Sequence, residues 1–261
     1  MTSRPLRLRD SHRLVWAIIY SKGMPLPVAF LQRLGPWLGR VSIKMTRGRV
    51  RFGDLRRVEP ISREFGFDRG LPVDRHYIER FLSAHSSDIR GRVLEIGDNI
   101  YTRKFGRVGV TRSDVLHVKD GNLNATIVAD LTRADHLPSE VYDCIIFTQT
   151  LQFIYDVRAA IRTLHKILRK GGVLLATFSG ITKISRDDME QWGDYWRFTT
   201  LSARLLFEEA FSHECVEVEA YGNVLAATGF LYGLAADELR PEELNYSDPD
   251  YEVLVALRAT K

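Results

Sequence analysis

Cysteine is scarce in this chain: only Cys144 and Cys215 occur among 261 residues, and each lies within an apolar stretch. We therefore expect buried free thiols in a reducing compartment and no disulfide. Long hydrophobic runs are also missing. The longest near the N-terminus, LVWAIIY at residues 14–20, is too short to span a bilayer, and the first residues show no signal-peptide cleavage pattern. These absences predict a cytoplasmic protein without a transmembrane segment.

Clusters of metal-binding side chains are absent too. No group of histidines and cysteines has the spacing of a zinc site, so the sequence predicts a protein without a bound metal. Charged residues make up 27% of the chain and hydrophobic residues 45%, which is ordinary for a globular protein and argues against extended disorder.

Acidic residues are nearly missing from the first 58 residues, where 13 Lys or Arg stand against Asp10 and Asp54. This segment carries a net charge of +11, so the rest of the chain carries −7. A basic arm on an acidic body is typical of contact with phosphate, anionic lipid or an acidic partner. It is also consistent with docking on the chain's own acidic domain or on a second subunit, as in a homodimer. We expect a basic, partly helical extension over residues 1–75.

From residue 76 onward, apolar strand-like runs alternate with helical patterns. The strand-like runs are RVLEIG, VGVTRSDVL, ATIVADL, YDCIIFTQ, GGVLLATFSG, ECVEVEAYG and YEVLVALRAT, and the helical patterns are VRAAIRTLHKILRKGG, TLSARLLFEEAFS and GNVLAATGFLYGLAADEL. Such alternation predicts an α/β domain with a mostly parallel sheet covered on both faces. The last two runs flank a single helix, so we expect seven strands with an antiparallel C-terminal edge in one domain over residues 76–261.

Polar residues follow several of these strands, at the place where an open α/β sheet binds its ligands. Glu95 lies in the first strand, and Asp114 follows 19 residues later, about the distance at which an acidic residue accepts ribose hydroxyls. Asp130 ends the third strand and can face an adenine edge. The residues expected to bind a nucleoside cofactor are Glu95, Gly97, Asp98, Asn99, Asp114, Val115, Asp130, Leu131, Thr148, Gln149 and Thr150.

The succession of VLEIG, Asp114, VADL and DCIIFTQTLQFIYDVRAAIRTLHKILRKGGVLLATF resembles the class I S-adenosylmethionine-dependent methyltransferases, in particular the type 11-like members found in glycan and natural-product gene clusters. LRKGG is similar to the family's Leu-x-Pro-Gly-Gly turn, and WGDYWRFTT is similar to a Tyr-Trp-Arg-Phe-Thr motif of those enzymes. The resemblance implies a Rossmann-like fold, S-adenosylmethionine as cofactor, and O-methylation of a hydroxyl on a sugar, glycoside or related natural product. Metal-dependent members end the fourth strand in Asp, where this chain has Thr148-Gln149-Thr150.

The first loop departs from the family's pattern, because Asn99 stands where the second Gly of Gly-x-Gly is usual. Asn tolerates a left-handed backbone better than other non-glycine residues, so the turn can survive. Gln152-Phe153 stand where many members have Glu-His, which removes a histidine base. A nicotinamide dehydrogenase, the competing Rossmann-type prediction, would need a fuller Gly-x-Gly-x-x-Gly.

Methyl transfer to a hydroxyl requires a base within hydrogen-bond reach. Asp194 and His136 are the catalytic candidates, with His117 and the Asp187-Asp188 pair as alternatives. Aromatic residues and an arginine surround Asp194, a composition that suits sugar faces and hydroxyls and equally suits a structural lid. The helix predicted to begin near Pro72 and Asp74 would form another wall of the acceptor pocket. The predicted substrate-binding residues are Arg69, Tyr77, Trp192, Tyr195, Trp196 and Arg197.

Two other functions remain open at the level of sequence. An RNA methyltransferase would contact phosphates through the basic arm, although the chain lacks the Asn/Asp-Pro-Pro-aromatic loop typical of base amino-methylation. A non-catalytic scaffold would keep the fold without binding S-adenosylmethionine. Titration with S-adenosylmethionine separates the enzymes from the scaffold.

Overall fold

The computed structural model describes residues 53–261, and most of the predicted basic extension lies outside the described residues. The chain divides into two compact units, Met1–Arg57 and Val58–Lys261. Of the first unit, the described part contains one 3-10 turn, η1 (Gly53–Leu55). Everything below concerns the second unit.

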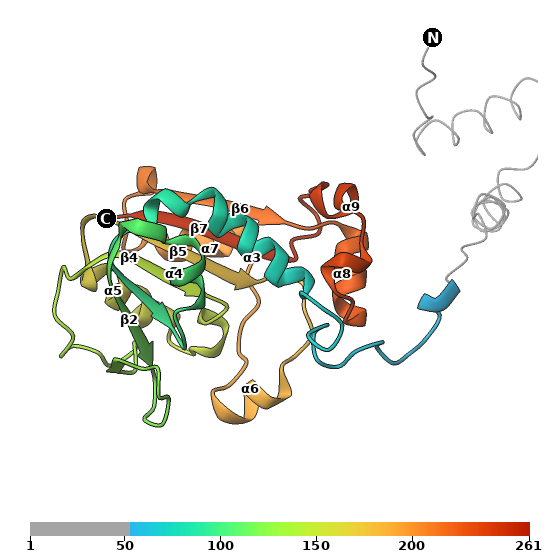
Figure 1. The fold of residues 1–261 in the computed structure, drawn as a ribbon, viewed down its shortest axis with the longest axis horizontal. Helices are drawn as coiled ribbons and strands as arrows, with labels where there is room; N and C mark the ends of the chain where they lie inside the picture. Colours follow the sequence, from blue (N-terminus) through green and yellow to red (C-terminus); the bar gives the residue numbers. More distant parts are fainter. Residues whose placement is uncertain (1–52) are drawn as a thin grey trace, which may run out of the picture. The chain divides into compact units, whose positions relative to one another are not determined.

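A seven-stranded sheet in the order β3-β2-β1-β4-β5-β7-β6 forms the centre of this unit (Figure 1). Its strands are β1 (Gly91–Ile96), β2 (Val110–His117), β3 (Ile127–Val128), β4 (Tyr142–Thr148), β5 (Leu168–Ser179), β6 (Val216–Tyr221) and β7 (Leu254–Thr260). The first five strands are parallel, and β7 pairs antiparallel with both β5 and β6. The predicted Rossmann-like sheet with an antiparallel C-terminal edge is therefore confirmed.

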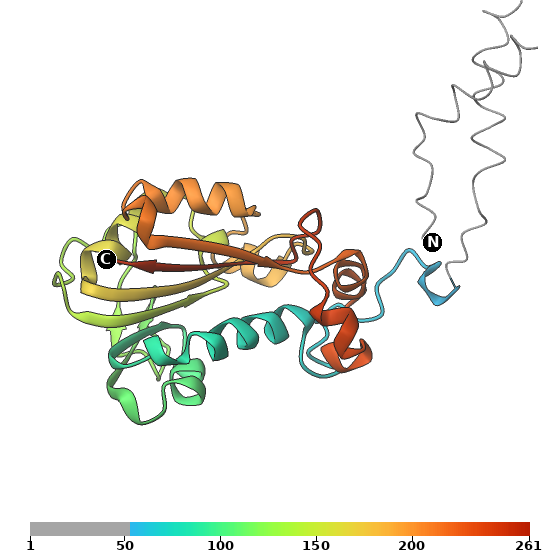
Figure 2. The same cartoon turned by 90° about the horizontal axis from the view of Figure 1, so that it is seen from above.

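Helices cover both faces of the sheet, and Figure 2 shows α3 and α7 on opposite sides of it. The α-helices are α3 (Val73–Ala84), α4 (Ile100–Phe105), α5 (Val157–Ile167), α6 (Arg186–Gln191), α7 (Thr200–Glu208), α8 (Val224–Tyr232) and α9 (Pro241–Asn245). The short 3-10 turns are η2 (Ser86–Asp88), η3 (Arg107–Gly109), η4 (Leu151–Phe153), η5 (His213–Cys215) and η6 (Ala236–Glu238).

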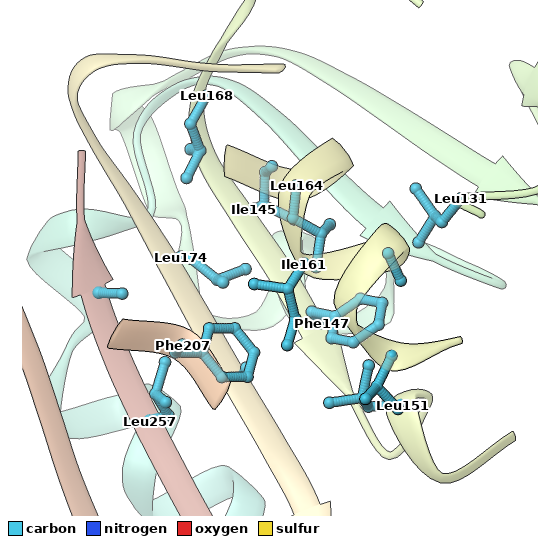
Figure 3. Close-up of a cluster of buried hydrophobic side chains, with 14 of the residues drawn as sticks. Leu131, Ile145, Phe147, Leu151, Ile161, Leu164, Leu168, Leu174, Phe207 and Leu257 are labelled. Atoms are coloured by element: carbon cyan, nitrogen blue, oxygen red, sulfur yellow. The ribbon is translucent and has the colours of Figure 1, made fainter. Parts of the chain in front are cut away.

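Two apolar cores follow from this arrangement, one on each face of the sheet. The first joins α5 and α7 to the sheet, and Figure 3 shows Ile161, Leu164 and Phe207 packed against strand residues such as Phe147. The second packs α3 and α8 on the other face, where Tyr77 and Phe81 are fully buried. Strands buried on both faces are the reason for the near-continuous apolar runs in the sequence.

Local sequence explains where α5 begins and ends. Asp156 caps its N-terminus by accepting a hydrogen bond from the Ala159 N–H, and the apolar residues of the helix recur every three or four positions. The LRKGG segment that resembles a family turn follows directly and opens β5, where Gly171 has a φ of 73°. A side chain would strain this backbone, so the chain reverses there on a glycine.

The segment before α3 lies against the C-terminal part of the chain. The backbone N–H groups of Ile61 and Ser62 both donate to the Tyr232 carbonyl, and the Ala236 N–H donates to the Leu71 carbonyl. These contacts bring residues 61–75 beside α8 and η6. This segment therefore lies toward the carboxyl ends of β1 and β4. Within residues 53–261, no helix is both long and apolar enough to cross a bilayer.

Candidate functional site

A cavity of about 880 Å³ opens beyond the carboxyl ends of β1, β2 and β4, and we call it the larger cavity. The strand order reverses between β1 and β4, which is where open α/β sheets bind ligands. The predicted cofactor residues that line it are Glu95, Gly97, Asp98, Asp130, Leu131, Thr148, Gln149 and Thr150. Its volume lies within the range of small-molecule and cofactor sites.

Glu95, at the end of β1, holds the loop that enters α4. Its Oε1 accepts the Tyr101 N–H at 3.0 Å, while its Oε2 accepts the Thr102 N–H and the Thr102 hydroxyl, both at 2.7 Å. The carboxyl is only 2% exposed, and this burial raises its pKa to about 7 although three donors favour the charged form. Glu95 therefore fixes the first turn of α4 at the cavity wall.

The loop keeps its glycine turn without a second left-handed residue. Gly97 has a φ of 81°, and a Cβ placed there would meet no atom within 4 Å. Asn99 has a φ of −129°, so the turn survives on Gly97 and does not use the left-handed conformation that asparagine tolerates. The physical reason is that α4 begins immediately after it, at Ile100. Asn99 does not line the larger cavity, and its amide donates to the Ser113 hydroxyl at 3.2 Å.

Asp114, the expected ribose ligand, lies away from the cavity. It pairs with Leu94 in the middle of β1, whereas β2 continues to His117. Its carboxylate is 1% exposed and accepts hydrogen bonds from Arg92 at 2.6 Å and Arg112 at 3.1 Å. The structure thus makes Asp114 a buried partner of two arginines. Its neighbour Val115 is buried in the sheet and lines no described cavity.

His117 occupies the strand end where the carboxylate was expected. Its Nδ1 lies 2.7 Å from the Lys119 carbonyl oxygen and 3.3 Å from the Lys119 backbone nitrogen, so Nδ1 is engaged with this turn, while no hydrogen bond of Nε2 is found among residues 53–261. The Trp192 ring packs edge-on against His117 with 5.5 Å between centroids, and Lys119 Nζ lies 4.4 Å from the centre of the same ring. These contacts connect the end of β2 to the segment that contains α6.

The ends of β3 and β4 complete the larger cavity. Asp130 accepts hydrogen bonds from the N–H and the hydroxyl of Thr132, so it stabilises a local turn. Gln149 has a φ of 46°, and its Oε1 accepts bonds from Ser179 Oγ at 2.6 Å and Gln152 Nε2 at 2.9 Å. A left-handed glutamine is strained, and such backbone concentrates at ligand sites.

A second cavity of about 250 Å³, which we call the smaller cavity, adjoins the larger one. The residues that line both are Phe67, Arg75, Gln149, Phe153 and Asp188. Asp74, Gln152, Lys183 and Asp194 line the smaller cavity alone. Two neighbouring cavities with a common wall can hold two different molecules side by side.

Asp194, a predicted base, is already fully bonded. Burial disfavours its charge, but hydrogen bonds from the Arg197 guanidinium and the Ser185 N–H hold its pKa below the ordinary value. Arg197 contacts both carboxylate oxygens, at 2.6 and 2.9 Å. An aspartate with both oxygens so engaged is a poor proton acceptor. His136, the other predicted base, is exposed in the loop after β3 and lines neither cavity.

Of the predicted substrate-binding residues, Trp192 and Tyr195 line the larger cavity and Arg197 lines the smaller one. Trp196 stacks on Tyr155, and its indole N–H donates to the Ile154 carbonyl, so it supports the wall from outside. The remaining two lie elsewhere. Arg69 forms an ion pair with Glu238, and Tyr77 is buried with its hydroxyl donating to the Leu244 carbonyl.

Sequence reasoning missed Lys119 and Ile100 in the larger cavity, and it left open whether Tyr101 reaches the cofactor. It also missed a role for Gln152, which is 4% exposed and whose buried Oε1 has no hydrogen-bond partner. Helical spacing could have indicated Glu79, one turn after Arg75 on the α3 face opposite Tyr77. Within the part of the chain that the structure describes, no group of three or more His, Cys, Asp or Glu could hold a metal.

Residues 108–176, from the start of β2 into β5, match the model of the methyltransferase domain family. The match begins after the Glu95–Asn99 loop, so it does not include the altered turn. A comparison with curated proteins found no match.

Solved structures with similar folds include an S-adenosylmethionine-dependent methyltransferase from Archaeoglobus fulgidus, which is 10% identical with a TM-score of 0.48 over 72% of this chain and 94% of that chain. A methyltransferase from Mesorhizobium loti is 14% identical with a TM-score of 0.47 over 75% and 100%. A possible histamine N-methyltransferase from Thermotoga maritima is 18% identical with a TM-score of 0.43 over 71% and 92%.

Proposed function

Because the chain belongs to the class I S-adenosylmethionine-dependent methyltransferases, we propose that it methylates a hydroxyl group on a sugar, glycoside or related natural product. The observation that carries this proposal is the pair of adjoining cavities with a common wall that includes Gln149 and Arg75. One cavity is large enough for the cofactor, and the other suits part of a small polar acceptor.

The residues of the larger cavity fit S-adenosylmethionine. Gly97 leaves open space where a side chain would project, so a ligand can approach the backbone closely. His117 Nε2 can form a hydrogen bond with a ribose hydroxyl, and Asp130 stands at the end of β3 for the adenine edge. Arg75, on α3, offers a cation for a carboxylate. When bound, S-adenosylmethionine supplies an electrophilic methyl group.

The smaller cavity suits a hydroxylated acceptor. Phe67 and Phe153 present apolar rings, while Gln152 and Asp74 present hydrogen-bond acceptors that a hydroxyl can satisfy. Phe65 and Gln149, two of three described non-glycine residues with positive φ, also line it. The protein's contribution to methyl transfer is to align the hydroxyl, exclude water and accept its proton.

The test combines ligand binding with methyl transfer. We expect calorimetric titration to show binding of S-adenosylmethionine and S-adenosylhomocysteine to the full chain. Radiolabelled S-adenosylmethionine should then label at least one member of a panel of methyl glucoside, methyl galactoside and methyl rhamnoside. No heat with either ligand at high protein concentration would support a non-catalytic scaffold. Labelling of tRNA or rRNA fragments, with the pyranosides unlabelled, would support an RNA substrate instead.

A further inference from the structure

The carboxylates around the two cavities differ in the hydrogen bonds they already make. In the larger cavity, Asp98 accepts the Ile100 N–H, and Asp156 caps α5. In the smaller cavity, Arg197 contacts both oxygens of Asp194, and Asp188 accepts the Ser185 hydroxyl at 2.6 Å. Asp98 and Asp156 therefore bond backbone N–H groups, whereas Asp188 and Asp194 bond side chains of the protein.

Asp74, the third aspartate of the smaller cavity, differs from Asp188 and Asp194 because its carboxylate bonds no side chain of the described residues. It lies in the first turn of α3, and its Oδ1 accepts the N–H of the next residue, Arg75, at 2.8 Å. Within residues 53–261, the Asp74 carboxylate forms no ion pair and no hydrogen bond with another side chain. Its Oδ2 is therefore available to a ligand in the smaller cavity. Burial raises the pKa of Asp74 above its ordinary value, which brings a carboxylate closer to the range of a general base.

Gln152 supplies an independent observation in the same cavity. Its Nε2 donates to Gln149, while its Oε1 is buried without a partner. A buried acceptor without a donor is unfavourable by about 1–3 kcal/mol, and a ligand hydroxyl would remove this cost. The smaller cavity thus offers two unfilled acceptors, Asp74 Oδ2 and Gln152 Oε1, which match a ligand that carries at least two hydroxyl groups.

We propose that Asp74 is the catalytic base, which takes the proton from the hydroxyl of a diol-bearing acceptor while Gln152 accepts a second hydroxyl of the same molecule. This inference rests on the proposed function. The acceptor oxygen forms a bond to the methyl carbon as the carbon–sulfur bond of the sulfonium breaks. The hydroxyl proton passes to the Asp74 carboxylate, and S-adenosylhomocysteine leaves with the electron pair on sulfur.

The decisive variant is Asp74→Asn, which keeps an oxygen for the Arg75 N–H but removes the base. We expect kcat for the best pyranoside to fall by about 10²–10⁴-fold, with loss of the acidic limb of the pH profile. Affinity for S-adenosylhomocysteine, measured by calorimetry, should change less than about threefold because Asp74 lies outside the larger cavity. Asp74→Glu should restore part of kcat. Gln152→Leu should raise KM more than it lowers kcat.

Asp187→Asn is the matched control, because Asp187 is an exposed aspartate on α6 that lines neither cavity. A wild-type kcat and pH profile in Asp74→Asn, or a larger loss in Asp188→Asn, would overturn the assignment of the base. If the wild type labels no pyranoside, the proposed function fails. An NMR titration of the Asp74 carboxyl carbon then still decides the inference, since a midpoint at or below the ordinary aspartate value would overturn it.

Discussion

The two cavities share a wall but use their polar groups differently. In the larger cavity, both oxygens of Glu95 and the Oδ1 atom of Asp130 accept hydrogen bonds from backbone and hydroxyl groups of the protein itself. In the smaller cavity, Asp74 and Gln152 keep an oxygen without a protein partner. When the hydrogen-bond acceptors of a cavity already bond the protein itself, the cavity is preorganised before a ligand binds. A site with unfilled acceptors selects for a ligand that brings donors.

Asp194 is the fully bonded carboxylate of the smaller cavity. Removing its ion pair with Arg197 should give the largest change in stability. Arg197→Ala leaves a carboxylate with 1% side-chain exposure without its countercharge, so we expect unfolding free energy to fall by about 3–5 kcal/mol. Asp194→Ala should cost less, because the Arg197 side chain is 31% exposed and can be solvated. Urea unfolding measures both. Equal losses, or a loss below about 1 kcal/mol in Arg197→Ala, would show that Asp194 is not held as a buried charge.

Glu95 gives the largest pH effect expected in the larger cavity. Burial raises its pKa from 4.5 to about 7, so between these values the folded state binds a proton that the unfolded state has released. Stability must therefore decrease as pH rises through this window, by up to about 3 kcal/mol from this group. Urea unfolding at pH 5, 6 and 7 should show this slope in the wild type and not in Glu95→Gln. A difference between the two proteins that does not change with pH would mean that Glu95 is ionised throughout.

The order of elements could be predicted from the sequence, because strands buried on both faces must be apolar and α5 has clear helical spacing. The cofactor side of the site could be predicted where polar residues lie at strand ends, as at Gly97, Asp130 and Gln149. Whether Asp114 reaches the cavity depends on where β2 ends. The register of β2 is set by its pairing with β1 and cannot be deduced from residue spacing. Asp74 lies far from the strand ends in sequence, so it could be expected in the acceptor pocket only through the helix predicted to begin beside it.

The end of β2 gives the next prediction, in which the two candidate ribose contacts are compared. His117→Ala should weaken binding of S-adenosylmethionine about tenfold, as expected for one lost hydrogen bond. Asp114→Asn should leave that affinity unchanged and lower the stability instead, because Asp114 bonds Arg92 and Arg112 and does not line the cavity. Calorimetric titration of both variants measures the affinities. The reverse result would show that Asp114, and not His117, binds the ribose.

Gly97 gives the smallest expected effect, and Gly121 provides a matched control. Both have positive φ, 81° and 106°, and a Cβ at either would meet no atom within 4 Å. Replacement by Ala should therefore strain each backbone by about 1–2 kcal/mol without a clash. Only Gly97 lines the larger cavity, so only Gly97→Ala should also weaken S-adenosylmethionine binding, by about threefold. If both variants bind the cofactor equally well, the open space at Gly97 is not the place where the ligand approaches the backbone, and its glycine serves the turn alone.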